Sequence, residues 1–196
     1  MHSRRFALVA ATILLLPITA QAQSRFELSL YPSSRLITTA GDTATEPRFK
    51  SYTPGGSLFV RLTPYFGLEA DFSGGRGDKQ DLGSFGRASS PPMTVLMGNV
   101  LVTVPTRSKV TPYATVGVGN IHMFSREAIG LDQGVSLASV NAGGGAKVMF
   151  GWWGIRADYR YVVMEALDTE TSPAFLGTDT RRAHRIAVGL TLALGR

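Results

Sequence analysis

Apolar and polar residues alternate along most of this chain, and the alternation is clearest at residues 153–161. There Trp153, Ile155 and Tyr159 share one parity, and the residues between them are charged or small. A period of two is typical of a β-strand, because successive side chains of a strand point to opposite faces. The pattern recurs along the chain and predicts an all-β fold. The predicted strands are residues 26–30, 57–63, 66–73, 93–104, 110–124, 140–150, 153–161 and 185–194.

The connections between these strands alternate in length. Transmembrane barrels have short turns at the periplasmic end and longer loops outside. The pattern therefore predicts an eight-stranded antiparallel up-and-down transmembrane β-barrel, with both chain ends on the periplasmic side. Short turns are predicted near Thr63-Pro64, Thr106–Lys109 and Gly151-Trp152, and longer polar loops near residues 39–51, 74–91, 125–135 and 167–181.

The first 22 residues have a different character. Arg4 and Arg5 precede the apolar run Phe6–Leu16, and Ala20-Gln21-Ala22 provides small residues for cleavage. This order is typical of a secretory signal peptide, and the run is too short for a membrane-spanning helix. We expect residues 1–22 to be a cleaved signal peptide and residues 23–196 to form an outer-membrane β-barrel domain in a Gram-negative envelope.

The alternation alone does not say which face points inward. A soluble periplasmic barrel of the lipocalin type would show the same period with its apolar face inside and could bind a ligand there. The loop asymmetry, the small residues on the charged face and the aromatic residues near strand ends favour the membrane barrel. The aromatic residues are Phe66, Phe72, Phe150, Trp152, Trp153, Tyr159 and Tyr161.

Charge and cysteine content narrow the possible partners. The net charge is +6, and it falls to +4 without Arg4 and Arg5, leaving 18 basic and 14 acidic residues. The charges are interspersed, so we expect no nucleic-acid partner. Cysteine is absent, which excludes thiol catalysis, thiolate metal sites and a lipidated cysteine anchor.

Two stretches carry a family resemblance. Val110-Thr-Pro-Tyr-Ala-Thr-Val-Gly-Val-Gly119, followed by residues 143–161 with their Gly-Gly-Gly start and Trp-Trp-Gly-Ile-Arg-Ala-Asp-Tyr-Arg-Tyr end, resembles the small outer-membrane β-barrel family that includes the OmpA transmembrane domain. The resemblance implies an eight-stranded, narrow barrel with a structural, adhesive or defence-related role more often than an enzymatic one. Such chains usually end on an aromatic residue that helps the assembly machinery recognise them, and this one ends Leu194-Gly195-Arg196.

The charged residues that alternate with apolar ones along the predicted strands form the candidate site. We call their positions the charged parity. The interior of an eight-stranded barrel is only wide enough for side chains to fill it, and buried charges are costly unless they are paired. We therefore expect these residues to form a structural lattice of salt bridges that plugs the lumen; a small pore or a polar ligand slot is the alternative. They are Glu27, Arg61, Glu69, Asp71, Lys147, Arg156, Asp158, Arg160 and Arg185.

An outer-membrane lipid-modifying enzyme is a further alternative. The mature chain has two histidines, His122 and His184, both on the apolar parity. A nucleophile must lie within hydrogen-bond reach of its base. Ser125 follows His122 by three residues, so the two side chains would point to opposite faces of a continuous strand. We expect interfacial histidines and no catalytic residues.

No cofactor or metal is expected. Gly143–Lys147 does not match a phosphate loop, and Gly117 and Gly119 lack the third glycine of a dinucleotide motif. The acidic loop residues lack the spacing of a calcium loop; they are Asp42, Glu46, Asp168, Glu170 and Asp179.

The expected partners are outer-membrane lipid and lipopolysaccharide. Basic loop residues provide a hypothesis for contact with lipopolysaccharide phosphates. The sequence thus predicts a monomeric, non-enzymatic barrel that contributes to envelope structure or to surface interaction through its loops, whose ligand is unknown. The basic residues are Arg76, Lys79, Arg126, Arg181 and Arg182.

Overall fold

The computed structural model describes residues 25–39, 49–81, 86–125, 134–166 and 180–194. The predicted signal peptide, Arg126 and the five acidic loop residues named above lie outside these ranges. Within the described ranges, no helix is long and apolar enough to cross a membrane.

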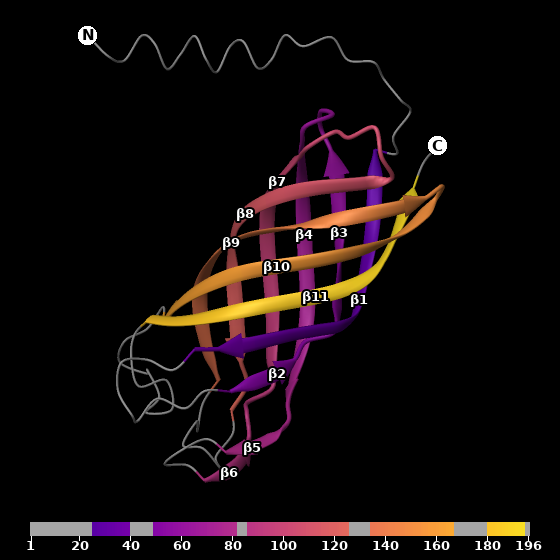
Figure 1. Ribbon diagram of the computed structural model, residues 1–196. Coiled ribbons are helices and arrows are strands. Elements are labelled where there is room, and N and C mark those ends of the chain that lie inside the picture. The colour runs from indigo at the N-terminus through magenta and orange to yellow at the C-terminus, as the bar shows by residue number, and fades with distance from the viewer. Residues whose placement is uncertain (1–24, 40–48, 82–85, 126–133, 167–179, 195–196) are drawn as a thin grey trace, which may run out of the picture.

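The described residues form an antiparallel ring of strands (Figure 1). β1 pairs with β11, which closes the sheet into a barrel. β2 and β3 both pair with β1 and with β4, so together they occupy one position in the ring. The ring therefore has eight members, as predicted. They are β1 (Phe26–Thr38), β2 (Lys50–Tyr52) with β3 (Gly55–Arg61), β4 (Phe66–Gly77), β7 (Met93–Thr103), β8 (Val110–Met123), β9 (Val135–Phe150), β10 (Trp153–Ala166) and β11 (Thr180–Leu194).

The turns that join β3 to β4, β7 to β8 and β9 to β10 are short and lie at one end of the barrel. β1 begins and β11 ends there, because Phe26 pairs with Leu194. Gly151 and Trp152 join β9 to β10 with only two residues, and Gly151 has a φ of 79°. A positive φ is strained for residues with a Cβ, which accounts for glycine at this position. By the rule for transmembrane barrels this is the periplasmic end, and the longer connections lie at the outer end.

Several strands run further toward the outer end than the sequence pattern indicated. β1 continues to Thr38, β10 to Ala166, and β11 already starts at Thr180. The predicted loop 74–91 contains the end of β4 and a small hairpin of β5 (Lys79–Asp81) and β6 (Arg87–Ser89). These predicted boundaries were wrong, and the reason is a change in the polarity of the two faces.

The polarity of the faces reverses along the barrel. On β7, the outward Val100 and Val102 are apolar and the inward Asn99 is polar and buried, as expected for a membrane barrel. Nearer the outer end of the same strand, Met93 and Val95 point inward and are buried. Apolar residues on both parities are what obscured the pattern of this strand in the sequence.

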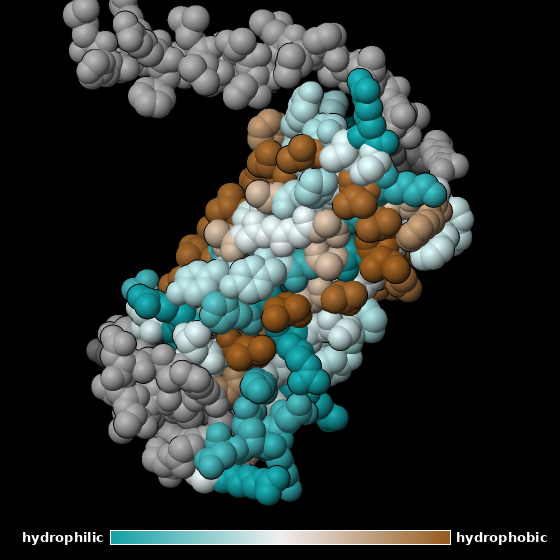
Figure 2. Space-filling model, in the orientation of Figure 1, coloured by the Kyte–Doolittle hydropathy of each residue, from teal (hydrophilic) through white to brown (hydrophobic). Residues whose placement is uncertain are grey.

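The outer end of the barrel has an apolar interior, called here the outer core. Its polar exterior includes Arg35, Lys50, Arg76, Glu165 and Arg182, all exposed. This arrangement is that of a water-soluble β-barrel, in which burial of apolar area supplies the stability. Figure 2 shows apolar surface around the middle of the molecule and hydrophilic residues toward its ends. The outer core consists of Leu36, Phe49, Met93, Val95, Met97, Ile121, Met123, Val135, Leu137, Val162, Met164 and Ala183.

A β-bulge in β1 brings its outer half into this pattern. The pairing of β1 with β11 shifts between Leu30 and Ser33, where Pro32 lacks an N–H to donate. The extra residue changes the parity, so Leu36 points inward although Leu28 points outward. A change of parity in mid-strand cannot be followed by a strict period of two, which is why the predicted strand stopped at residue 30.

Candidate functional site: a charge lattice across the lumen

The predicted charged parity faces the lumen. Eight of its nine residues are at most 6% exposed, and the side chain of Arg61 is 12% exposed. Each of the nine takes part in at least one ion pair with another member. We call this set the lumen lattice. It comprises Glu27 on β1, Arg61 on β3, Glu69 and Asp71 on β4, Lys147 on β9, Arg156, Asp158 and Arg160 on β10, and Arg185 on β11.

The centre of the lattice joins opposite walls of the barrel. β4 and β10 are four positions apart in a ring of eight, which is the greatest separation possible. Glu69 on β4 accepts from Nη1 of Arg156 at 2.5 Å and from Nη2 of Arg160 at 2.7 Å. Charge-assisted hydrogen bonds of this length are among the strongest in proteins. The three side chains therefore form a bar across the lumen.

Tyrosines complete this central layer. Tyr113 donates to Oδ2 of Asp158 at 2.6 Å and accepts from Nε of Arg156 at 2.7 Å. The guanidinium of Arg156 also lies 4.6 Å from the Tyr113 ring centroid and 5.6 Å from that of Tyr31. Neither tyrosine belongs to the predicted set, which contains only charged residues, although each lies on the inward parity of its strand.

A second layer of ion pairs lies on the periplasmic side of the lumen. Glu27 accepts from Arg61 at 2.8 Å and from Lys147 at 2.5 Å. The ammonium of Lys147 lies 4.5 Å from the centroid of the Phe59 ring, and Phe59 is fully buried against Leu101. Apolar packing and ion pairing thus occupy the same level of the barrel.

A third layer faces the outer core. Arg185 on β11 donates to Asp71 on β4 at 2.8 Å, and Asn141 donates to Asn99 at 2.9 Å. Asn99 in turn lies 3.4 Å from Oε1 of Glu69, which links the layer to the central bar. Moving outward, the interior thus changes from ion pairs to neutral amides and then to the apolar side chains of the outer core.

The basic loop residues divide between the two faces. Lys79, Arg76 and Arg182 are exposed at the outer end, as contact with lipopolysaccharide requires. Arg181 is only 3% exposed, and its position on β11 has the inward parity. The buried position of Arg181 therefore does not suit contact with lipopolysaccharide phosphates, whereas the exposed positions of the other three do.

Both histidines lie on the outward face, each bonded to a hydroxyl. Nδ1 of His122 is 2.9 Å from Oγ of Ser136, and Nδ1 of His184 is 2.7 Å from the hydroxyl of Tyr159. Ser125, considered with His122 in the sequence, lies beyond the end of β8. The Ser136 contact depends on the register between β8 and β9, which the sequence does not display.

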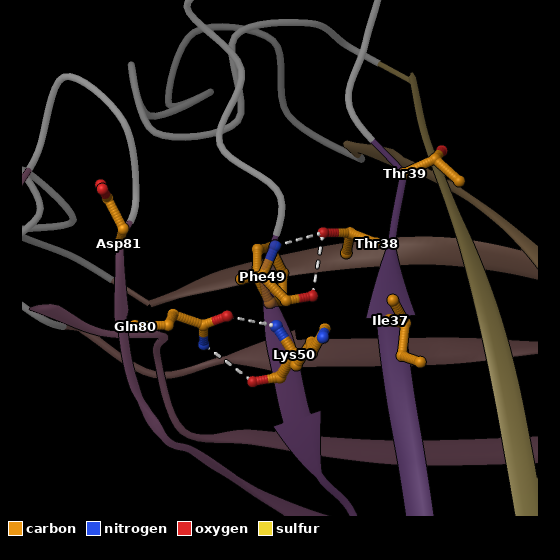
Figure 3. A pocket seen from close by; sticks show the side chains of 7 residues that line it. All are labelled: Ile37, Thr38, Thr39, Phe49, Lys50, Gln80 and Asp81. Atoms are coloured by element: carbon orange, nitrogen blue, oxygen red, sulfur yellow. Dashed lines mark hydrogen bonds between the residues drawn. The ribbon is translucent and has the colours of Figure 1, made fainter. Parts of the chain in front are cut away.

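The described residues also form a pocket at the outer end, shown in Figure 3. It has a volume of about 480 Å³ and is lined by Ile37, Thr38, Thr39, Phe49, Lys50, Gln80 and Asp81. The side-chain amide of Gln80 accepts from the backbone N–H of Lys50 at 2.7 Å and donates to its carbonyl at 2.9 Å. Gln80 thereby ties the segment around β5 to the barrel. In the described part of the chain, no group of three or more His, Asp or Glu side chains is arranged to hold a metal ion.

The comparisons with known proteins agree with this architecture. The family model described as "Outer membrane protein beta-barrel domain" matches residues 6–192. The chain belongs to this family. Its place is therefore the outer membrane, with the apolar outer face toward lipid and the charged face inside, and the soluble, lipocalin-like alternative is excluded. No curated protein matches the sequence.

Solved structures with the same fold have little sequence in common with this member of the family. The crystal structure of Neisserial surface protein A is 12% identical with a TM-score of 0.61, covering 89% of this chain and 100% of that one. The solid-state NMR structure of outer membrane protein AlkL in lipid bilayers is 14% identical with a TM-score of 0.50, covering 92% and 96%. At these identities the likeness establishes the fold alone.

Proposed function

We propose that this protein is a closed, non-enzymatic barrel that anchors a surface platform in the outer membrane. The observation that carries the proposal is the bar of Glu69, Arg156 and Arg160 from one wall of the lumen to the other. A continuous water path would have to pass side chains that are at most 2% exposed. The lattice therefore acts as a plug.

Opening this plug would be energetically unfavourable. Separating one partner of a buried ion pair costs about 3–5 kcal/mol, because the remaining charge is left uncompensated. Arg156 and Arg160 each pair with both Glu69 and Asp158, so moving any of these side chains disturbs at least two pairs. The apolar outer core above the lattice is a second barrier to ions.

The outer end supplies the platform. The hairpin of β5 and β6 is fastened by Gln80 to Lys50 and by Ser90 to Ser51, whose hydroxyl oxygens are 3.0 Å apart. Loops on such a rigid scaffold are typical places for surface recognition. The exposed Arg76, Lys79 and Arg182 suit the phosphates of lipopolysaccharide.

The proposal that the protein is not an enzyme is supported by the surroundings of its histidines. In the described part of the chain, neither His122 nor His184 forms an ion pair with a carboxylate, the group that usually orients a catalytic imidazole. We also propose a monomer, because β1 pairs with β11 and the eight-membered ring therefore has no open edge for a second copy to join.

Planar lipid bilayers test the plug directly. We expect no steady ionic current from the purified protein. A variant with Glu69→Ala, Arg156→Ala and Arg160→Ala removes the central bar. If it folds, we expect an ionic current above that of the wild-type protein, limited by the outer core that remains above the gap. Glu165→Ala, on the exposed face of β10, is the matched control. Stable unitary currents from the wild-type protein would contradict the proposal, whatever the variants do.

A further inference from the structure

The periplasmic end of the barrel carries charge of one sign. In the described part of the chain, the exposed ionisable residues of this end are Arg25, Arg107 and Lys109, and its only carboxylate, that of Glu27, is buried and already paired with two cations. At the outer end, by contrast, Asp78, Asp81 and Glu165 are interspersed with the basic residues. The exposed periplasmic surface is therefore cationic and attracts an anionic partner.

Aromatic side chains lie directly beside Lys109, one of these cations. The ammonium of Lys109 is 5.9 Å from the centroid of the Phe150 ring, and that ring is 5.0 Å from the ring of Trp153. Trp152 in the adjoining turn is 61% exposed. We call Arg107, Lys109, Phe150, Trp152 and Trp153 the inner-leaflet patch.

The position of the patch identifies the kind of partner. Phe150 and Trp153 are exposed on the outer wall, at the periplasmic edge of the apolar band, and Val110 and Ile155 beside them are 41% and 44% exposed. Aromatic rings of this kind settle at the depth of lipid headgroups, and basic residues beside them pair with phosphates. Lys109 stands next to a lipid-facing wall, and Arg107 is exposed two residues before it, so a lipid can contact both the cations and the wall.

We infer that the inner-leaflet patch binds the headgroup of an anionic phospholipid in the periplasmic leaflet of the outer membrane. Arg107 and Lys109 pair with the phosphate, and Phe150 and Trp153 contact the glycerol region and the first part of the acyl chains. This inference depends on the location of the barrel in the outer membrane and not on the plugged lumen.

The chain offers its own reporter of this contact. Its two tryptophans, Trp152 and Trp153, are both in the patch. Bromine on an acyl chain quenches tryptophan at close range, so fluorescence measures which lipid occupies the site. The protein is refolded in vesicles of phosphatidylcholine and phosphatidylglycerol at a fixed ratio, with bromine on either the first or the second lipid.

We expect stronger quenching when phosphatidylglycerol carries the bromine. Each cation in contact should enrich the anionic lipid about fivefold at low salt. The enrichment should decrease at high salt, which screens exposed charges. The double variant Arg107→Gln with Lys109→Gln should lose the preference, and the control variant Lys50→Gln with Arg87→Gln, both exposed at the outer end, should keep it.

Two results would overturn the inference. One is equal quenching by both brominated lipids in the wild-type protein at low salt. The other is an unchanged preference in the folded Arg107→Gln, Lys109→Gln variant, with folding checked by gel mobility before and after boiling. If the first result is accompanied by sedimentation with isolated cell-wall sacculi that depends on Arg107 and Lys109, the cations face the wall and the lipid assignment is wrong.

Discussion

Glu69 on β4 holds Arg156 and Arg160 of the opposite wall at 2.5 and 2.7 Å through its two carboxylate oxygens. Arg156 and Arg160 lie four residues apart on β10, with Asp158 between them on the same face. One carboxylate thus connects two cations across the full width of the lumen. This relationship makes Glu69 the carboxylate that joins the two arginines of β10 to the opposite wall.

Replacement of Glu69 should destabilise the barrel. Glu69→Gln keeps the shape of the side chain but leaves both guanidinium groups short of a counter-charge, so we expect a loss of about 3–5 kcal/mol. Urea unfolding in lipid vesicles measures the change in the free energy of unfolding. Glu165→Gln on the exposed face of β10 should change it by less than about 0.5 kcal/mol. Equal midpoints for the two variants would show that the lattice is not structural.

Two alanines of β9 test the reversal of polarity. Ala138 and Ala146 both have the outward parity, but Ala138 pairs with Glu165 and Asn120 at the outer end, whereas Ala146 pairs with Ala157 in the apolar band. We expect Ala146→Lys to cost about 2 kcal/mol in lipid vesicles, because the charge must enter hydrocarbon. Ala138→Lys should cost less than about 0.5 kcal/mol. Similar losses for both variants would place the membrane boundary elsewhere.

Two hydrogen bonds join the side-chain amide of Gln80 to the backbone of Lys50, and we call this pair the amide clamp. It leads to a prediction about hydrogen exchange. Because the N–H of Lys50 donates to the Gln80 side chain, Gln80→Ala should speed hydrogen exchange at the Lys50 amide. Loss of a hydrogen bond worth about 1 kcal/mol corresponds to roughly fivefold faster exchange. NMR of the protein in lipid measures it, with Lys79→Ala as the control. Unchanged exchange at Lys50 would mean that the clamp does not protect this edge.

The contact of His122 with Ser136 provides a test of the non-enzymatic proposal. We expect the wild-type protein, His122→Ala and Ser136→Ala to leave phospholipids and lipid A unchanged, as measured by mass spectrometry of membranes that contain each protein. Tyr159→Phe, which removes the partner of His184, is the matching variant on the other histidine. Hydrolysis by the wild-type protein that disappears in either of the first two variants would establish a catalytic pair.

The number of strands and the identity of the inner face could be predicted from the sequence. Along the strand at residues 153–161, for example, Arg156, Asp158 and Arg160 are charged and alternate with uncharged residues. The outer limits of the strands could not be predicted in this way. At the outer end, Met93 and Leu137 point inward while polar residues point outward. The alternation there still has a period of two, but the apolar residues face the interior instead of the lipid. The bulge at Pro32 adds a change of parity that no periodic pattern anticipates.

The pairings between residues of the site could not be predicted from the sequence either. Glu69 and Arg156 are far apart in the chain and meet only because the ring closes, and Ser136 meets His122 only through the register of β8 and β9. Tyr31 and Tyr113 could have been included, since a phenol on a charged parity is a suitable partner for a guanidinium. The sequence shows on which face of its strand each residue lies. Which partner it meets depends on how the sheet closes into a barrel.

The apolar band on the outer wall is bounded on both sides. At one edge stand Trp153 and Lys109, and at the other, further toward the outer end than Tyr159, the wall becomes charged at Glu165 and Arg182. Sinking or rising would push charges into hydrocarbon or expose the band to water, so the barrel is fixed at one depth. In a thicker or thinner membrane, the surrounding lipids must stretch or compress to match it, which gives this protein a preference for membranes of one thickness.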